Sequence, residues 1–402
     1  MHILQINNNH RITGGSDRLY INTGELLESA GHDVSYFSAK SDKDLDCKDS
    51  EYFCDAIDTK NAGISDVKRF LFNEDARNML DSMMGKRKRV DIAHLHIYYG
   101  RLTSSILKPL KTRKIPVVQS LHEYKLICPV YTLERNGNIC EACVTGTSAN
   151  CVRYRCRDNS LHKSALLWLE HNLSRLHGSN RLIDRFICVS DFQREMFVRA
   201  GISEHKLITL HNFVDAKSVQ PKIDKPRQDY LLYFGRIEKL KGVPTLLEAV
   251  AGTDIKLKIA GVGAWSAELR ERVRRMPNVE YLEFVSGEPL KQLVAQARAV
   301  VVPSEWYETF GLTALEAKAV GTPVIASRIG GLTEVIREGE DGFLFEPGDV
   351  ESLRTALKTL EKADIAAMTN AARQDVASRF SPETYLARLL DIYATTINET
   401  HT

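Results

Sequence analysis

Two glutamates and a run of backbone amides stand close together within residues 301–336, VVPSEWYETFGLTALEAKAVGTPVIASRIGGLTEVI. Glu308 and Glu316 flank Phe310, Gly311 and Leu312, where the pattern predicts the start of a helix. The unpaired N–H groups of a helix N-terminus, together with the helix dipole, favour an anion such as a phosphate. A glycine at this point lets the phosphate approach the backbone. The alternative is an ordinary strand–helix unit whose glutamates are merely solvated.

The strand and the helix that flank these residues predict where the residues lie in the fold. An apolar strand ends at Val302, a polar and aromatic loop spans 303–310, and an Ala/Leu/Glu-rich helix follows over 312–320. Gly321-Thr322-Pro323 ends that helix, and a strand resumes at 324–326. This is a unit of a parallel sheet, with the loop at the carboxyl end of a strand, where open α/β folds bind ligands.

A second loop carries two cations. The predicted strand 229–234 runs into Gly235-Arg236, and Lys241-Gly242 follow just before the next helix. Arginine, as a planar fork, and lysine, as a point charge, together suit a diphosphate. Taken alone, such a pair is more often solvated. The next strand, 255–260, again ends in glycine, at Gly261.

The first half of the chain shows the same alternation of strands and helices. Strand 2–7 leads through a polar loop to Gly14-Gly15 and a helix, but the glycines do not form the G-x-G-x-x-G pattern of dinucleotide sites. Gly14 and Gly15 are therefore interpreted as a place where a ligand approaches the backbone. His122 lies just past strand 116–120 and either serves a ligand or satisfies a loop carbonyl.

The length of 402 residues predicts two α/β domains. We expect an N-terminal domain over 1–215, a polar linker over 216–228, a second domain within 216–380, and a helix over 381–402 that returns to the domain junction. The first residues read as a strand and not as a signal peptide, and no apolar run approaches about 18 residues. These features predict a cytoplasmic protein.

Four of the eight cysteines form the pattern Cys140-x2-Cys143-x7-Cys151-x4-Cys156 within an apparent insertion at 128–160. In a reducing compartment such thiols can hold a structural zinc ion in tetrahedral geometry. Free thiols and a redox pair are the alternatives.

The segment 86–185 is strongly basic. It holds 18 Lys and Arg against 7 Asp and Glu, an excess of 11 positive charges in a chain whose net charge is +2. An anionic partner is therefore expected: nucleic acid, a phospholipid surface or a phosphorylated substrate. Within this segment, apolar residues recur at helical spacing over 161–176, which predicts a helix packed on the core, with a membrane-surface helix as the alternative.

Taken in order, these motifs resemble those of the retaining glycosyltransferases of family 4, which have the GT-B fold. The resemblance rests on Gly235-Arg236 with Lys241-Gly242, on Gly261-x-Gly263 and on Glu308-x-Phe310-Gly311 with Glu316. Gly321-Thr322-Pro323-Val324, Gly330-Gly331 and Asp341-Gly342 follow in the same order. It covers essentially the whole chain and implies two Rossmann-like α/β domains facing a central cleft. The cysteine cluster resembles a bacterial subgroup that builds surface polysaccharides. Glu283 stands where the family commonly has a glycine, near the base pocket.

The resemblance implies roles for single residues. Arg236 and Lys241 hold the donor diphosphate, and the amides at 310–312 assist them. Glu316 accepts hydrogen bonds from the ribose hydroxyls, Glu308 contacts the transferred sugar, and His122 lies near the sugar and the acceptor. The implied catalytic residues are His122, Arg236, Lys241 and Glu308. The implied donor-binding residues are Gly14, Gly15, Gly235, Arg236, Lys241, Gly261, Glu308, Phe310, Gly311, Leu312 and Glu316.

The implied reaction is the retaining transfer of a hexose from a GDP- or UDP-sugar, such as GDP-mannose, without a catalytic metal. The implied acceptor is a phosphorylated, lipid-linked oligosaccharide in polysaccharide or lipopolysaccharide biosynthesis, met by a peripheral enzyme on an anionic inner membrane face. An epimerase or phosphorylase of the same fold and a non-catalytic nucleotide-sugar-binding subunit are alternatives. Nucleic-acid binding is not expected, because no recognisable module accompanies the basic segment.

Overall fold

The computed structural model describes residues 1–57, 63–87, 89–222 and 225–401. Residues 223 and 224 of the predicted linker and Lys88 of the basic segment lie outside the described residues. The chain forms two compact units. The first comprises Met1–Leu133, Cys140–Leu210 and Leu386–Thr402, and the second comprises Glu134–Ile139 and His211–Tyr385.

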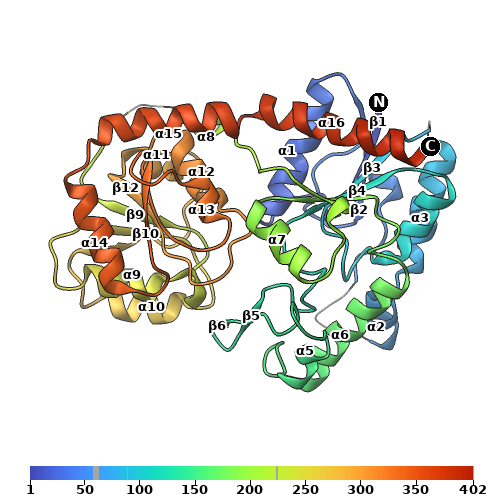
Figure 1. Ribbon diagram of the computed structural model, residues 1–402, viewed down its shortest axis with the longest axis horizontal. Coiled ribbons are helices and arrows are strands. Elements are labelled where there is room, and N and C mark those ends of the chain that lie inside the picture. Colours follow the sequence, from blue (N-terminus) through green and yellow to red (C-terminus); the bar gives the residue numbers. More distant parts are fainter. Residues whose placement is uncertain (58–62, 88, 223–224, 402) are drawn as a thin grey trace. The chain divides into compact units, whose positions relative to one another are not determined.

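The first unit is built on a parallel sheet in the order β2-β1-β3-β4-β7-β8 (Figure 1). β1 pairs with both β2 and β3, so that Ile3 lies between Val34 and Ile92. The strands are β1 (His2–Asn9), β2 (Asp33–Ala39), β3 (Ile92–Leu95), β4 (Val117–Leu121), β7 (Arg185–Cys188) and β8 (Leu207–Thr209). The helices are α1 (Gly15–Ser29), η1 (Ser50–Tyr52), α2 (Ile64–Leu71), α3 (Glu74–Lys86), η2 (Ser104–Ile106), α4 (Leu107–Thr112), α5 (Asn150–Arg153), α6 (Leu161–Leu176), α7 (Asp191–Arg199) and η3 (Glu204–Lys206).

The second unit repeats this plan with the strand order β11-β10-β9-β12-β13-β14, again all parallel. The strands are β9 (Leu231–Phe234), β10 (Leu257–Ala260), β11 (Val279–Tyr281), β12 (Ala299–Val302), β13 (Val324–Ser327) and β14 (Gly342–Phe345). The helices are α8 (Ala216–Val219), η4 (Lys239–Lys241), α9 (Val243–Val250), α10 (Ser266–Val273), α11 (Gly287–Gln296), α12 (Leu312–Ala319), α13 (Leu332–Val335), α14 (Val350–Glu361) and α15 (Ile365–Arg379). A hairpin of β5 (Glu134–Arg135) and β6 (Asn138–Ile139) and the long helix α16 (Pro382–His401) complete the chain.

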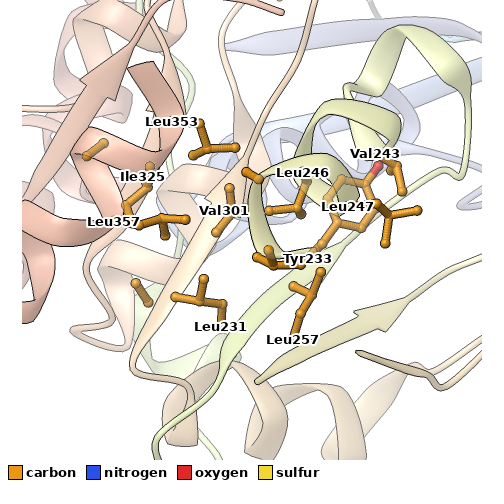
Figure 2. Packing of buried hydrophobic residues seen from close by; sticks show 14 of the residues in the cluster. Leu231, Tyr233, Val243, Leu246, Leu247, Leu257, Val301, Ile325, Leu353 and Leu357 are labelled. Atoms are coloured by element: carbon orange, nitrogen blue, oxygen red, sulfur yellow. The ribbon is translucent and has the colours of Figure 1, made fainter. Parts of the chain in front are cut away.

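The core of the second unit explains why its strands are nearly continuous apolar runs. Side chains of β9, β10, β12 and β13 meet those of α9 and α14 on one face of the sheet (Figure 2). Both faces of a parallel sheet are covered by helices, so alternation with polar residues is lost. The labelled side chains are Leu231, Tyr233, Val243, Leu246, Leu247, Leu257, Val301, Ile325, Leu353 and Leu357.

The predicted fold class is confirmed, because each unit is a Rossmann-like α/β structure with a parallel sheet. The helix expected over 312–320 is α12, and the strand expected over 324–326 is β13. The terminal helix forms as α16.

The predicted packing of the helix over 161–176 is wrong. α6 buries Ser164, Glu170, His171 and Ser174, whereas Leu161, Leu169 and Leu176 are exposed. The reason is a polar network beneath the helix. The Nζ of Lys125 lies 2.6 Å from a carboxylate oxygen of Glu170, and both side chains are at most 5% exposed.

Candidate functional site

The strand order of the second unit brings two loops together. β9 pairs with β10 on one side and with β12 on the other, so the direction of the strand order reverses between β9 and β12. Ligands of open α/β sheets bind at this switch point, beyond the carboxyl ends of the strands. The loop after β9 carries Arg236 and Lys241, and the loop after β12 carries Glu308. The backbone also joins the loops, since the Glu305 N–H donates to the Leu240 carbonyl over 2.8 Å.

Lys241 and Glu308 form the centre of this site. The Lys241 Nζ lies 2.6 Å from Glu308 Oε1, which also accepts a hydrogen bond from the Ser304 hydroxyl over 2.5 Å. The ammonium group lies 4.7 Å from the centre of the Trp306 ring, close enough for a cation–π interaction. Burial acts to raise the pKa of Glu308, but the charge and hydrogen bond of Lys241 and the hydrogen bond of Ser304 outweigh it and lower that pKa. Glu308 is therefore an ionised acceptor of hydrogen bonds.

The two predicted cations are held differently. The Lys241 side chain is 18% exposed, whereas that of Arg236 is 61% exposed and pairs with Glu238, with 2.9 Å from Nη1 to Oε1. The backbone at Arg236 is anchored from below, because the Tyr233 hydroxyl donates to its carbonyl over 2.7 Å. Lys241 is thus a positioned charge, and Arg236 is an exposed side chain on a positioned backbone.

Two of the predicted glycines allow backbones to approach closely. Gly261 has φ of +142°, and a Cβ there would lie 1.8 Å from the Gly235 carbonyl oxygen. Gly311 has φ of +111° and caps the N-terminus of α12, where a Cβ would lie 2.5 Å from Leu332. Both positions therefore require glycine.

The predicted anion site lies at the start of α12. Its first residue is Leu312, and its N-cap, Gly311, has no side chain to satisfy the free amides. The Phe310 side chain is 1% exposed and packs against the rings of His211 and Phe380. The ring of Phe310 therefore anchors the loop, and only its backbone amide is left to contact a ligand. Glu316 lies in the second turn of α12 and is partly buried.

Lys318, which the sequence reading missed, anchors the same helix. Its fully buried Nζ lies 2.8 Å from Asp341 and 2.6 Å from Asp375, and it also donates to the Val335 carbonyl over 2.5 Å. Both carboxylates are at most 1% exposed. This network ties α12 to α13, α15 and the turn before β14. A lysine in the last turn of an Ala-rich helix gives no sequence signal of such burial.

In the first unit, His122 is partly buried and stacks on the buried ring of His96. Its Nε2 lies 2.8 Å from Nδ1 of His96, whose Nε2 lies 3.0 Å from Gln5 Oε1. The rings of His96 and His94 are stacked, and His94 Nδ1 lies 2.6 Å from the Tyr393 hydroxyl on α16. Burial lowers the pKa of His122 to about 4, so it is neutral at pH 7. A neutral, oriented imidazole suits a hydrogen bond to a hydroxyl group.

The first turn of α1 holds a carboxylate that the sequence alone did not indicate. Asp17 is 3% exposed and accepts hydrogen bonds from Asn7 Nδ2 over 2.9 Å and from the Thr13 N–H over 3.1 Å. It lies in the first turn of α1, where it already supplies a negative charge. Gly14 is extended, with φ of −169°, and has open space where a Cβ would point. Its use for a ligand therefore stays a prediction, as does that of Gly15.

A fifth thiol lies beside the four predicted metal ligands. Cys128 is 5% exposed, and Cys128, Cys156 and Cys140 lie near enough to Cys143 for their charges to influence it. Burial, with these neighbours, raises the pKa of the Cys143 thiol to about 12. Cys151 and Cys156 share a hydrogen bond. Among the described residues, no three of these thiols have all their sulfur atoms within 4.8 Å of one another. A zinc ion, with Zn–S distances of about 2.3 Å, would draw them closer.

Two such α/β units with polar loops at the strand ends define the class of two-domain proteins built from Rossmann-like units, and comparison with known proteins gives the family. The model of glycosyltransferase family 4 matches residues 13–218, and that of glycosyl transferases group 1 matches residues 215–375. The chain belongs to glycosyltransferase family 4.

Individual proteins also match this chain, at low sequence identity. The chain is 33% identical over 249 residues to a glycogen synthase of Mycobacterium tuberculosis, covering 56% of this chain and 59% of that protein. It is 29% identical over 253 residues to O-antigen chain mannosyltransferase B of Escherichia coli, covering 58% and 65%. The chain thus spans less than two thirds of each. HepE of Anabaena, solved in complex with UDP-glucose, matches with a TM-score of 0.65 at 18% identity, covering 98% of this chain and all of that chain. No helix in the described parts is both long and apolar enough to cross a bilayer.

Proposed function

We propose that this protein is a retaining hexosyltransferase that uses a GDP- or UDP-sugar. The observation that carries this proposal is the Lys241–Glu308 pair at the switch point of the second unit, next to the uncapped N-terminus of α12. The cation and the helix amides suit a diphosphate, and the ionised glutamate suits sugar hydroxyls. The structure of HepE with UDP-glucose supports the donor class.

In this proposal the chain's own residues stabilise the leaving nucleotide. Lys241, Arg236 and the amides at 310–312 neutralise the charge that develops on the diphosphate as the glycosidic bond breaks. The departing phosphate takes the proton of the acceptor hydroxyl, so the new bond forms on the face from which the nucleotide leaves. Glu316 accepts hydrogen bonds from the ribose hydroxyls, and neutral His122 orients the sugar or the acceptor. The cations thereby take the charge-neutralising role of a catalytic metal.

The proposed acceptor is a phosphorylated, lipid-linked oligosaccharide at the cytoplasmic face of the inner membrane. Support comes from the excess of 11 positive charges over 86–185 and from the similarity to an O-antigen mannosyltransferase. A basic surface draws an anionic acceptor to the enzyme.

The donor is tested by thermal unfolding of the full chain with UDP, GDP, ADP and their common hexose conjugates. We expect one nucleotide and its conjugate to raise the Tm by several degrees at about 100 times Kd, because a ligand of the native state stabilises it. Product analysis with that donor and a lipid-linked acceptor is expected to show a lengthened glycan with a retained anomer. A Tm unchanged by all nucleotides, or release of a free epimer or sugar phosphate, would contradict the proposal.

We further propose that Cys140, Cys143, Cys151 and Cys156 are the four ligands of one structural zinc ion, with the buried thiol of Cys128 beside them. This segment has two two-residue strands and one four-residue helix, so it lacks a core of its own. A metal would supply the missing stabilisation.

Protein purified without added metal is expected to contain one equivalent of zinc by mass spectrometry. Cys143→Ser should lose it, because a tetrahedral site needs thiolate ligands, whereas Cys47→Ser, outside the segment, should keep it. Less than about half an equivalent in the unmutated protein would refute this proposal.

A further inference from the structure

Helix α6 turns polar side chains towards the protein and apolar side chains towards the outside, the opposite of an ordinary surface helix. It buries Ser164, Glu170, His171 and Ser174 and leaves Leu161, Leu169 and Leu176 exposed, at 48%, 39% and 77%. The side chains of Leu166, Leu167, Trp168 and Leu173 are only partly buried. On a surface helix that faces only water, the apolar side chains pack on the core and the polar side chains are exposed.

The buried polar face prevents the helix from turning over. Glu170 pairs with buried Lys125 over 2.6 Å, and the Lys125 carbonyl lies 3.1 Å from His171 Nδ1. The Ser164 hydroxyl accepts from the Arg157 N–H over 3.0 Å. Rotating α6 to bury its leucines would leave Lys125 buried without its counter-charge, which is strongly unfavourable. The outward apolar face is therefore a stable feature of the folded chain.

A neighbouring helix extends this apolar surface. α2 lies beside α6 (Figure 1), and the ring of Phe72, just after α2, contacts that of His177, just after α6. α2 buries none of its residues, and Ile64 and Val67 are 93% and 37% exposed. Five of the twelve exposed large apolar residues of the described chain thus lie on these two helices. Several exposed large apolar side chains on two neighbouring helices are typical of a site of interaction.

The charge beside this surface is positive. Between 150 and 176 the exposed charged side chains are four cations, Arg153, Arg155, Lys163 and Arg175, and one carboxylate, Asp158. Asp158 is already paired with Lys163, with 2.8 Å from oxygen to Nζ. Leucines and an aromatic residue with basic residues around them are typical of a helix that lies in the interface of an anionic bilayer.

We propose that the exposed faces of α2 and α6, with Ile64, Val67, Leu161, Leu169 and Leu176 as the inserted residues, dock the chain onto an anionic lipid surface. The proposal extends the proposed function, since a lipid-linked acceptor is met at such a surface, but its evidence is independent of the donor site. Basic side chains attract the lipid headgroups, and the apolar side chains enter the boundary of the acyl region.

The test is flotation of the full chain with vesicles of phosphatidylcholine alone or with 30% phosphatidylglycerol, about the content that gives a strong negative surface potential. We expect binding to the anionic vesicles, weakened by 0.5 M salt, since roughly molar ionic strength screens surface charge within a few ångströms. The double variant Leu169→Ser/Leu176→Ser should bind about 100-fold more weakly, at about tenfold per leucine. Leu45→Ser removes a leucine of similar exposure, 44%, from the same unit and should bind as the unmutated chain does.

Three results would overturn the proposal. One is that the unmutated chain fails to float with anionic vesicles, and another is that the double variant floats equally well. The third is that light scattering shows a dimer that the double variant abolishes, which would assign the surface to a second copy of the chain. An unchanged Tm shows that the variant is folded. Its nucleotide-induced Tm shift, measured without vesicles, reports the donor site separately, so failure of docking is distinguishable from failure of the proposed function.

Discussion

Replacement of Lys241 by alanine is expected to lower kcat/KM for sugar transfer by about 10²–10³-fold. This is the range for removing one positioned group that stabilises developing negative charge. Lys241 is positioned for this task because Glu308, at 2.6 Å, and the Trp306 ring, at 4.7 Å, hold its ammonium group at the switch point. The variant also loses the charge that keeps the pKa of the partly buried Glu308 low. The measurement is the initial rate with the donor identified by thermal unfolding.

The matched control is Lys239→Ala, two residues earlier in η4, where the lysine is exposed. It removes the same charge from the same loop and should change kcat/KM less than about threefold, since exposed charges are largely screened by salt. A Lys241→Ala rate within threefold of the unmutated rate, with the Tm unchanged, would remove Lys241 from the proposed mechanism.

Replacement of Lys318 by alanine is expected to lower the free energy of unfolding of the second unit by about 3–5 kcal/mol, the usual cost of removing one partner of a buried ion pair. Lys318 is 0% exposed and pairs with both Asp341 and Asp375. Asp375 keeps Arg379, with 2.7 Å from Nε to the carboxylate, whereas Asp341 keeps only the longer pair with Arg337, at 3.5 Å, so Asp341 bears more of the loss. Because Lys318 is on α12, we also expect weaker donor binding.

Urea unfolding followed by tryptophan fluorescence measures this change. Trp265 and Trp306 lie in the second unit and Trp168 lies in the first, so a Trp168→Phe background makes the signal report the second unit. Lys358→Ala on α14 is the control, because that lysine is exposed and its loss should cost less than about 0.5 kcal/mol. A loss below about 1 kcal/mol for Lys318→Ala would show that α12 is held by other contacts.

The local sequence pattern was enough to predict the strands and helices, and to indicate Lys241 and Glu308 separately as candidate site residues. Apolar runs bounded by glycine and proline predicted the strands, and the Ala-rich segment after Gly311 predicted α12. Lys241 and Glu308 were each singled out for lying in a loop after a strand. Such signals are local, because backbone conformation and periodicity depend on near neighbours.

The tertiary structure alone decided which of these residues meet. Lys241 pairs with Glu308 because β9 and β12 are adjacent in the sheet although they are distant in sequence. Burial of Asp17, Lys318 and Cys128 likewise follows from their surroundings. For α6 the apolar spacing identified a helix but could not show which side faces the protein. The buried Lys125–Glu170 pair decided that, since a buried charge must keep its partner and leucine tolerates exposure far better.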